Sequence, residues 1–246
     1  RPAMPARLFV EMGSMNTLFI VGTPIGNLED ISDRALDILR QVSLIASENP
    51  QRTQRLLARY DILTPMMRYT DAYERKKRQR MEAVLAALEE GDVALVSEAG
   101  MPGLADPGYE LIAAAREREV PVVPAPGPTA LAAALSVAGI PAERFIFLGF
   151  LPRTRSRRRE LLAPLVDSPF TLIAYESPHR LLDTLAELDR LFGDRRMAAA
   201  CELTKLYEET RRGTPTELRD HFHARRPRGE FTLVVAGAGP EGSLKP

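Results

Sequence analysis

Cysteine and tryptophan are almost absent from this chain, which has 246 residues, one cysteine at Cys201 and no tryptophan. A single cysteine excludes an internal disulfide, and the apolar neighbours of Cys201 predict a buried, unreactive thiol. An excess of charge of either sign is also absent, because 33 Lys and Arg balance 33 Asp and Glu. No overall electrostatic field therefore indicates a nucleic acid or an acidic partner, and only local clusters of charge can do so.

Long apolar runs are lacking as well. No run approaches the roughly 20 residues of a membrane-spanning helix, and the N-terminus shows no signal-peptide pattern. We therefore expect a cytoplasmic protein with no membrane partner. Residues 1–14 precede Met15 and the first strand-like run, so they are expected to be a leader or a tag remnant. Residues 240–246 are expected to form a frayed tail.

Several catalytic motifs are missing. The sequence contains neither a phosphate-binding loop nor a dinucleotide-binding fingerprint, and no Gly-x-Ser-x-Gly elbow offers a serine nucleophile. The three histidines, His179, His221 and His223, lie apart from any Cys/His cluster, so no metal is expected. His221 and His223 are expected to be solvated. His179 follows a helix start, where contact with a substrate and simple packing are equally compatible with its position.

Short apolar runs alternate with segments of helical spacing through most of the chain. In the first 150 residues, four such runs end in loops that are rich in Gly and Pro or begin with a helix cap, and these loops start at Gly22, Glu48, Ser97 and Pro124. This alternation predicts a parallel α/β sheet with all four loops on the edge where ligands bind. A change of composition after Phe150 predicts two α/β domains, residues 15–150 and 151–239.

The third of these loops, Ser97–Gly108, is the richest in unusual residues. It holds three glycines, two prolines and two carboxylates. Glycine lets the backbone approach a ligand closely and proline fixes the path of the chain, so the loop is predicted to hold a small molecule against main-chain groups. Asp106 and Pro107 are also predicted to start a helix, as N-cap and first residue.

Two clusters of basic residues interrupt the balanced charge. The run 75–80 falls on a charged helical segment, and an exposed helix face explains it most simply. The second cluster has a single sign of charge and lies at the predicted domain junction, where a long substrate would cross. It is therefore predicted to contact RNA phosphates. Its members are Arg153, Arg155, Arg157, Arg158 and Arg159.

Five motifs, taken in order, resemble those of the tetrapyrrole methylase superfamily, and within it those of the enzymes that methylate ribosomal RNA of the small subunit. The motifs span residues 18–30, 96–109, 126–129, 175–180 and 202–205. Each motif alone is weak, but their combination and order are specific. The resemblance extends from about residue 15 to residue 239.

The resemblance implies a function and an architecture. The expected reaction is S-adenosylmethionine-dependent 2′-O-ribose methylation of a cytidine in the decoding region of small-subunit (16S) ribosomal RNA. The small ribosomal subunit or its RNA would be the substrate, and the enzyme would be a homodimer with the cofactor in a cleft between its two α/β domains. Carried over by motif, the cofactor contacts fall on Thr23, Pro24, Gly100, Met101, Pro102, Leu104, Thr129, Ala130, Tyr175 and Leu203.

The chain departs from the family pattern in two places. Asn49 stands where members of the family have an aspartate, and Glu98 and Met101 replace an Asp and a Thr. A carboxylate near the 2′-oxygen would orient or deprotonate that hydroxyl, since alkoxide character must develop there. The candidates for this role are Glu48, Glu98 and Glu176.

Each candidate also has a structural explanation. Glu48 could pair with Arg52, Glu98 could accept backbone N–H groups in its own loop, and Glu176 could pair with Arg180.

Two other functions remain open at this point. The first is a C-methyltransferase acting on a tetrapyrrole, which is the chemistry of other members with this fold. The second is a non-catalytic RNA-binding or assembly factor, which the departures from the family pattern would allow.

Overall fold

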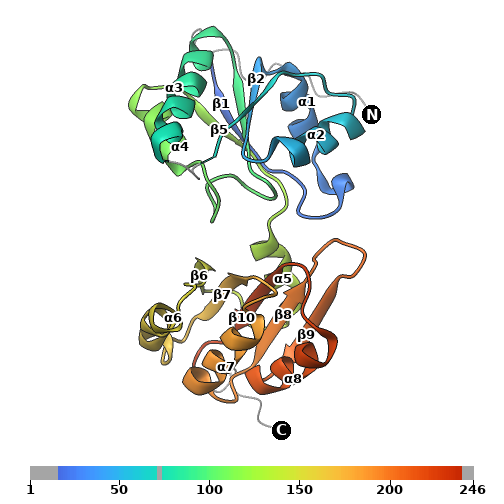
Figure 1. Cartoon of the computed structure of the whole chain (residues 1–246), viewed down its shortest axis with the longest axis vertical. Coiled ribbons are helices and arrows are strands. Elements are labelled where there is room, and N and C mark those ends of the chain that lie inside the picture. The colour runs from blue at the N-terminus through green and yellow to red at the C-terminus, as the bar shows by residue number, and fades with distance from the viewer. Residues whose placement is uncertain (1–15, 71–73, 240–246) are drawn as a thin grey trace. The chain divides into compact units, whose positions relative to one another are not determined.

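The computed structural model describes residues 16–70 and 74–239, which fold as two compact units (Figure 1). The first unit contains residues 16–24 and 28–127, and the second contains residues 25–27 and 128–239. The expected leader at 1–14 and tail at 240–246 lie outside the described residues. Of the helices within the described ranges, none is long and apolar enough to cross a membrane.

The first unit is built on a five-stranded sheet in which every pairing is parallel, as the sequence predicts. The strand order is β3-β2-β4-β1-β5. The strands are β1 (Leu18–Val21), β2 (Leu44–Ser47), β3 (Met66–Arg68), β4 (Val93–Val96) and β5 (Val122–Ala125). The carboxyl ends of β1, β2, β4 and β5 bring the four predicted loops to one edge of this sheet.

Helices cover both faces of the first sheet. They are α1 (Asp33–Gln41), α2 (Pro50–Arg59), α3 (Glu74–Glu90) and α4 (Tyr109–Glu117), with a short 3-10 helix η1 (Leu28–Asp30). Because strand side chains alternate, Phe19 and Val21 pack in a core with α1 and α2, whereas Leu18 and Ile20 pack in a core with α3 and α4. In the basic run on α3, Lys76 and Arg78 are exposed, as expected.

The predicted cap at Asn49 is confirmed, but the predicted cap at Asp106 is wrong. Asn49 accepts a hydrogen bond from the backbone of Arg52 and is followed by Pro50 at the start of α2. Helix α4 begins only at Tyr109, and its N-cap is Gly108 with φ of 137°. That conformation is open to glycine and strained for other residues, so the turn at 106–108 delays the helix by two residues.

The second unit contains a mixed five-stranded sheet of order β6-β7-β10-β8-β9. Strands β6 and β7 are parallel, and the remaining pairs are antiparallel. The strands are β6 (Phe145–Phe150), β7 (Thr171–Glu176), β8 (Met197–Cys201), β9 (Glu209–Gly213) and β10 (Phe231–Val235). The pairing of β6 with β7 places residues 145–150 in this unit. The predicted boundary at 150 is therefore wrong, and the two units divide after Gly127.

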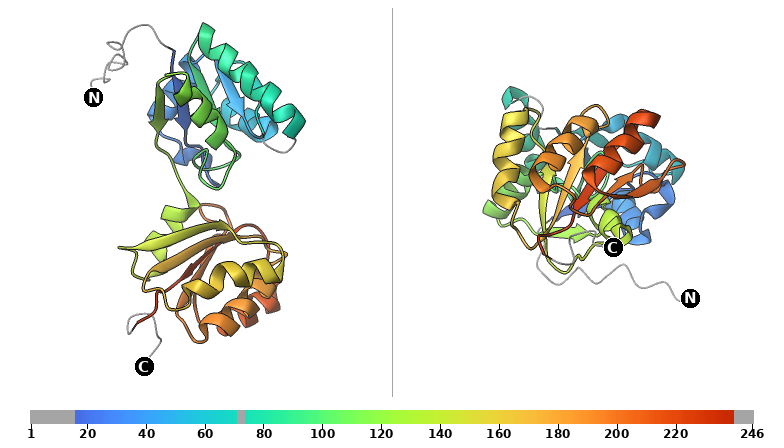
Figure 2. Two further views of the ribbon diagram at one scale, coloured as in Figure 1. Left: turned by 90° about the vertical axis from the view of Figure 1, so that its left-hand side faces the viewer. Right: turned by 90° about the horizontal axis from the view of Figure 1, so that it is seen from below.

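The two faces of the second sheet are covered differently. The helices on one face lie side by side (Figure 2), and their apolar side chains form the larger core with the sheet. They are α6 (Arg155–Leu162), which continues into the 3-10 helix η2 (Ala163–Leu165), α7 (Leu181–Phe192) and α8 (Pro215–Arg225). The other face packs against the single helix α5 (Ala130–Ala138). The capping box expected at Thr214 and Glu217 is present at the start of α8.

Candidate functional site

At the carboxyl edge of the first sheet, the loops after β1 and β4 are joined by their backbones. The amide of Thr23 donates to the carbonyl of Gly100 at 2.8 Å, and the amide of Gly100 donates to the carbonyl of Thr23 at 3.0 Å. This reciprocal pair is a single antiparallel bridge between two loops that follow parallel strands. It brings the predicted cofactor residues Thr23 and Gly100 together.

Glycine is required where the loops after β1 and β5 meet. A Cβ atom added to Gly22 would lie 2.7 Å from the Cα of Gly127 and 2.7 Å from the sulfur of Met101. A Cβ on Gly127 would lie 2.8 Å from backbone atoms of Gly22. The loops therefore bring main chain against main chain, which is the arrangement expected from their glycine content.

The hydroxyl of Thr23 is the least satisfied group of this edge. Thr23 is buried, and its Oγ1 has no hydrogen-bond partner among the described residues. Leaving a buried hydroxyl unpaired costs about 1–3 kcal/mol, so native proteins rarely tolerate one without a function. The neighbouring predicted residues Pro24, Met101 and Leu104 are half-buried, and Pro102 is buried.

Two of the three candidate carboxylates lie together beside this bridge. The Glu48 carboxylate accepts a hydrogen bond from the amide of Glu98 at 2.9 Å. The Glu98 carboxylate receives the side-chain amide of Asn49 at 3.1 Å and the guanidinium of Arg52 at 3.0 Å. Arg52 thus forms an ion pair with Glu98. Asn49 binds Glu98 through its amide nitrogen, which an aspartate at this position lacks.

The third candidate, Glu176, is excluded from such a role by its surroundings. It is 1% exposed, and both of its oxygens are bound within the second unit. One oxygen contacts the Arg180 guanidinium at 2.7 Å and the backbone of Ser177 at 2.8 Å, and the other accepts the Thr184 hydroxyl at 2.6 Å. The structural alternative of pairing with Arg180 is confirmed, and the catalytic prediction for Glu176 is wrong because the carboxylate is buried and both of its oxygens already accept donors of the second unit.

The predicted cofactor residues of the second unit gather around the start of α5. Thr129 caps this helix by accepting the amide of Ala132 at 3.1 Å, and Ala130 is its first residue. The hydroxyl of Tyr175 accepts the amide of Leu131 at 3.2 Å. Tyr175 therefore lies beside Thr129 and Ala130 through contacts with the first turn of α5.

Leu203 is buried in the same core as α5. The loop that contains Leu203 also contacts residues 25–27 of the loop after β1. The backbone amide of Asn27 donates to the hydroxyl of Thr204 at 3.0 Å. A Cβ on Gly26 would lie 2.8 Å from the carbonyl oxygen of Leu203. The segment 25–27 is thus part of the second unit although it lies between two stretches of the first.

The five arginines of the predicted RNA-binding cluster have different surroundings. Arg155 and Arg159 each donate to the carboxylate of Glu187, at 2.8 and 2.7 Å, and so tie α6 to α7. The hydrogen bond from Arg159 lowers the pKa of Glu187. Arg158 is buried and donates to the carbonyl of Pro152, so the structure removes it from the phosphate-binding set. Arg153 and Arg157 are exposed.

The remaining titratable residues of interest fit largely structural roles. Cys201 is buried as predicted, and burial raises the pKa of its thiol to about 11. His223 and His179 are exposed. The expectation of a solvated His221 is wrong, because its ring nitrogen lies 2.7 Å from the Glu209 carboxylate.

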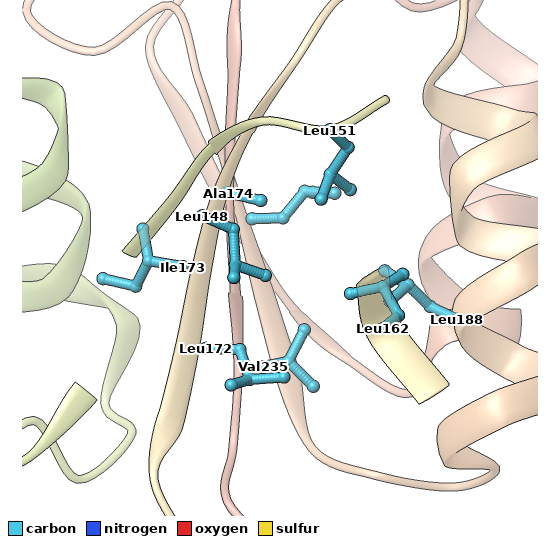
Figure 3. A pocket seen from close by; sticks show the side chains of 9 residues that line it. Leu148, Leu151, Leu162, Leu172, Ile173, Ala174, Leu188 and Val235 are labelled. Carbon is cyan, nitrogen blue, oxygen red and sulfur yellow. The ribbon is translucent and has the colours of Figure 1, made fainter. Parts of the chain in front are cut away.

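A small cavity in the second unit is not a substrate site. It measures about 10 Å³ and lies between the sheet and helices α6 and α7 (Figure 3). Its lining is entirely apolar and includes Leu148, Leu151, Leu162 and Leu188. A space of this size holds about one water molecule and offers no polar partner to it, so it is a packing gap.

Sequence reasoning missed two residues that organise the second unit. Glu187 is the buried partner of two arginines, but its position within an ordinary amphipathic helix gives no signal of this. Phe150 is a large exposed aromatic residue at the end of β6. The glycine before it, inside a strand pattern, could have indicated a bulge.

Residues 17–219 match the family described as Tetrapyrrole (Corrin/Porphyrin) Methylases. A ribosomal RNA small subunit methyltransferase I from Thermotoga maritima is 46% identical over 224 residues, which cover 91% of this chain and 99% of the relative. A protein of the same name from Pseudomonas aeruginosa is 45% identical over 234 residues, covering 93% and 82%.

Solved structures of lower sequence similarity share the fold. The chain resembles a cobalt precorrin-4 methyltransferase with a TM-score of 0.68 and 20% identity, over 89% of this chain and 94% of that one. It also resembles a uroporphyrin-III C-methyl transferase from Thermus thermophilus, with a TM-score of 0.64 and 18% identity, over 90% and 97%. The chain therefore belongs to the tetrapyrrole methylase family and, within it, to the group of the ribosomal RNA small subunit methyltransferases I.

Proposed function

We propose that this protein transfers a methyl group from S-adenosylmethionine to the ribose 2′-oxygen of a cytidine in the decoding region of small-subunit ribosomal RNA. Curated relatives that are 41–46% identical over most of the chain carry the name of ribosomal RNA small subunit methyltransferase I, which supports a ribosomal RNA substrate. The observation in the structure that carries the proposal is the buried Thr23 hydroxyl, left without a partner beside the glycine-lined bridge to Gly100.

The residues at this edge fit S-adenosylmethionine. The Thermus thermophilus uroporphyrin-III C-methyl transferase of similar fold was solved in complex with S-adenyl homocysteine. In the present chain, Gly22 and Gly127 let the loops after β1 and β5 pack main chain against main chain, and the buried Thr23 hydroxyl has no partner among the described residues, so it can bind a polar atom of the cofactor. From the first unit, Thr23, Pro24, Gly100, Met101, Pro102 and Leu104 would hold the cofactor.

From the second unit, Thr129, Ala130, Tyr175 and Leu203 would complete the cofactor-binding set. Three of them are grouped by the first turn of α5 and its hydrogen bond to Tyr175. The bound cofactor supplies a methyl group on a positively charged sulfur, and no metal is required for its transfer. The protein's own task is to hold the ribose oxygen in line with that carbon, and positioning alone removes part of the barrier.

Glu98 and Glu48 are the residues proposed to orient or deprotonate the 2′-hydroxyl. Glu98 is the stronger candidate, because Arg52 and Asn49 fix its carboxylate while more than a third of its side chain stays exposed. Glu48 is half-buried and already accepts the amide of Glu98. A general base contributes about 10²–10⁴ in rate, so changing the acting residue to Gln should cost a factor of that order.

We further propose that the enzyme acts as a homodimer in the cytoplasm, on the small subunit or its RNA. Analytical ultracentrifugation at micromolar concentration tests the dimer. A single species with the mass of one chain would contradict it.

A tetrapyrrole C-methyltransferase remains the second candidate function. It is favoured by the solved structures of similar fold, whose titles name enzymes of that class. Their identity of about a fifth shows the fold and does not extend to the substrate. A non-catalytic RNA-binding factor is the third candidate, since Asn49, Glu98 and Met101 depart from the family pattern.

Radiolabelled methyl donor separates the three candidates. The protein is offered S-adenosylmethionine with small subunits that lack the modification, with naked ribosomal RNA and with a tetrapyrrole precursor. We expect label in ribosomal RNA and, after nuclease digestion, in 2′-O-methylcytidine. Label in the tetrapyrrole would support the second candidate. RNA binding without any label would support the third.

A further inference from the structure

The edge strand β6 carries one extra residue near its end. Phe147 pairs with Ile173 and Phe150 pairs with Tyr175, so three steps along β6 match two steps along β7. Gly149 lies within this irregularity and has φ of 61°, in the left-handed region that favours glycine. An extra residue of this kind is a β-bulge, and it changes the face to which the following side chain points.

The bulge turns Phe150 away from the core. In a regular strand, Phe150 would follow Leu148 onto the face covered by α6 and α7. Instead, Leu148 and Leu151 line the cavity on that face (Figure 3). Phe150 lies on the opposite face, with its ring 5.4 Å from the ring of Tyr175. Its side chain is 58% exposed, so a large apolar surface beside Tyr175 is left open.

Unpaired cationic groups follow Phe150 directly in the chain. Arg153 and Arg157 are exposed, and among the described residues neither has a carboxylate partner. Arg157 lies in the first turn of α6, and Arg153 lies just before its extended N-cap Thr154, so both follow Phe150 within seven residues of the chain. Arg155 and Arg159 are held by Glu187 on another side of α6.

The loop after β7 is hydrogen-bonded to the segment that joins β6 to α6. The Arg180 guanidinium donates to the carbonyl of Leu151, the residue that follows Phe150, at 3.0 Å. His179, the neighbour of Arg180, is exposed. The backbone after Phe150 is therefore fixed at Leu151, whereas the side chains of Arg153 and Arg157 face solvent.

We propose that Phe150, Arg153 and Arg157, here called the Phe150 surface, bind a single-stranded stretch of the RNA substrate. A base stacks on the Phe150 ring, and the two guanidinium groups contact the flanking phosphates. An exposed aromatic ring beside arginines is a recurrent way of binding unpaired RNA, because stacking needs no particular base and the charges follow the backbone. This inference rests on the proposed function, since it specifies how the RNA is held.

Direct binding of a fluorescein-labelled single-stranded RNA, followed by anisotropy, tests the stacking contact. Loss of one stacked base weakens binding roughly five- to a hundredfold, so Phe150→Ala should show a loss in that range and Phe150→Trp should not. Phe145→Ala is the matched control, because Phe145 is also an exposed phenylalanine of β6, at 43%, but lies before the bulge. It should bind RNA as the unaltered protein does.

The salt dependence of the same binding tests the two arginines. Each phosphate contact contributes about 0.7 to the slope of log affinity against log salt for a single strand. Arg153→Ala and Arg157→Ala should each lower the slope by about that amount. Arg155→Ala serves as the control, because its guanidinium is already occupied by Glu187, and it should leave the slope nearly unchanged.

Two outcomes would overturn the Phe150 surface. The first is RNA binding by Phe150→Ala that equals the binding of the unaltered protein. The second is a loss confined to affinity for S-adenosylmethionine, measured by calorimetry without RNA, which would assign Phe150 to the cofactor. Both are distinct from failure of the proposed function, which is decided by methyl transfer from the unaltered protein to ribosomal RNA.

Discussion

Thr23 is the residue of the candidate site at which effects on ligand affinity and on folding stability can be told apart most clearly. Its hydroxyl is buried and unpartnered, so it contributes nothing to the stability of the ligand-free chain and imposes a desolvation cost. Valine has nearly the same shape without the hydroxyl. A substitution at this position should therefore move affinity and stability in opposite directions.

The first prediction concerns Thr23→Val. We expect the affinity for S-adenosylmethionine to fall about five- to a hundredfold, because a buried hydrogen bond is worth about 1–3 kcal/mol when its loss leaves the partner unsatisfied. The melting temperature of the ligand-free protein should stay the same or rise. Calorimetric titration and thermal unfolding measure the two quantities. Thr23→Ser, which keeps the hydroxyl, should retain binding, and equal affinities for Thr23→Val and the unaltered protein would show that the hydroxyl meets no ligand.

Asn49 illustrates how a departure from a family pattern can be compensated by a neighbour. Its side-chain oxygen caps α2, and its nitrogen donates to Glu98. Aspartate is an equally good cap but would place a second negative charge against Glu98. The pair Asn49 and Glu98 is thus compatible where two carboxylates would repel each other.

The second prediction tests this pair. Asn49→Asp should destabilise the protein by about 1 kcal/mol, because a hydrogen bond is lost and like charges face each other. That loss corresponds to a fall of about 2–4 °C in melting temperature. The double variant Asn49→Asp with Glu98→Gln restores a donor opposite an acceptor and should recover most of the loss. A double-variant stability equal to the sum of the two single effects would contradict the contact.

At the scale of elements, α6 is attached to α7 through a buried carboxylate. Glu187 is 1% exposed and accepts from both Arg155 and Arg159, whose own side chains are more than half exposed. The hydrogen bond from Arg159 lowers the pKa of Glu187 below its ordinary value in the unfolded chain. A carboxyl group with a lowered pKa in the folded state stabilises the fold above its unfolded pKa and loses that contribution as the pH falls.

The third prediction follows from the sign of this shift. Glu187→Gln should be less stable than the unaltered protein at about pH 7, and the difference should shrink as the pH falls below about 4.3, the ordinary range for glutamate. Urea unfolding at a series of pH values measures it. Glu160→Gln removes an exposed carboxylate from α6, the helix that carries Arg155 and Arg159, and should show no such convergence. A difference for Glu187→Gln that is independent of pH would indicate packing rather than charge.

The sequence predicted helices and strands well where residues close together in the chain determine the structure. The apolar run of β4 and the caps at Asn49 and Thr214 are confirmed because they depend only on neighbours in the chain. Strands β3 and β9 were not predicted. Strand β3 has three residues, and β9 reads Glu-Thr-Arg-Arg-Gly, so neither shows an apolar pattern. They are strands because β2 and β8 offer hydrogen-bonding edges to them.

In the candidate site, too, some features follow from local sequence signals and others depend on long-range packing. The sequence predicts that the loops containing Thr23 and Gly100 lie at one edge, because parallel strands send their carboxyl ends there; the topology confirms this, and the bridge between them is a further feature of the structure. For Glu176 the sequence left both a catalytic role and pairing with Arg180 open, and for Arg158 it gave no sign of burial. Both are charged residues in motifs that suggest a ligand, but long-range packing buries them and supplies their partners. The domain boundary failed for a similar reason, since the composition change at 151 marks the approach to α6 rather than the end of a unit.

At the scale of the whole molecule, each unit has its own buried core. In the first, Leu39 lies in the cluster that joins α1 and α2 to the sheet. In the second, Leu185 lies in the cluster formed by α6, α7 and α8. Cys201 belongs to the second core and is the chain's single cysteine. Because burial raises the pKa of its thiol to about 11, Cys201 should react with thiol reagents only when the second unit opens.

The last prediction uses Cys201 to ask whether the units unfold separately. Leu39→Ala and Leu185→Ala remove matched, fully buried side chains, and each should cost about 2–5 kcal/mol. Thiol labelling of Cys201 is followed across a urea gradient at about pH 8, where the thiol of unfolded chains reacts readily. We expect Leu185→Ala to move the labelling midpoint to lower urea, because it weakens the core that protects the thiol. Leu39→Ala should leave it unchanged. Equal shifts for the two variants would mean that the two cores unfold as one cooperative structure.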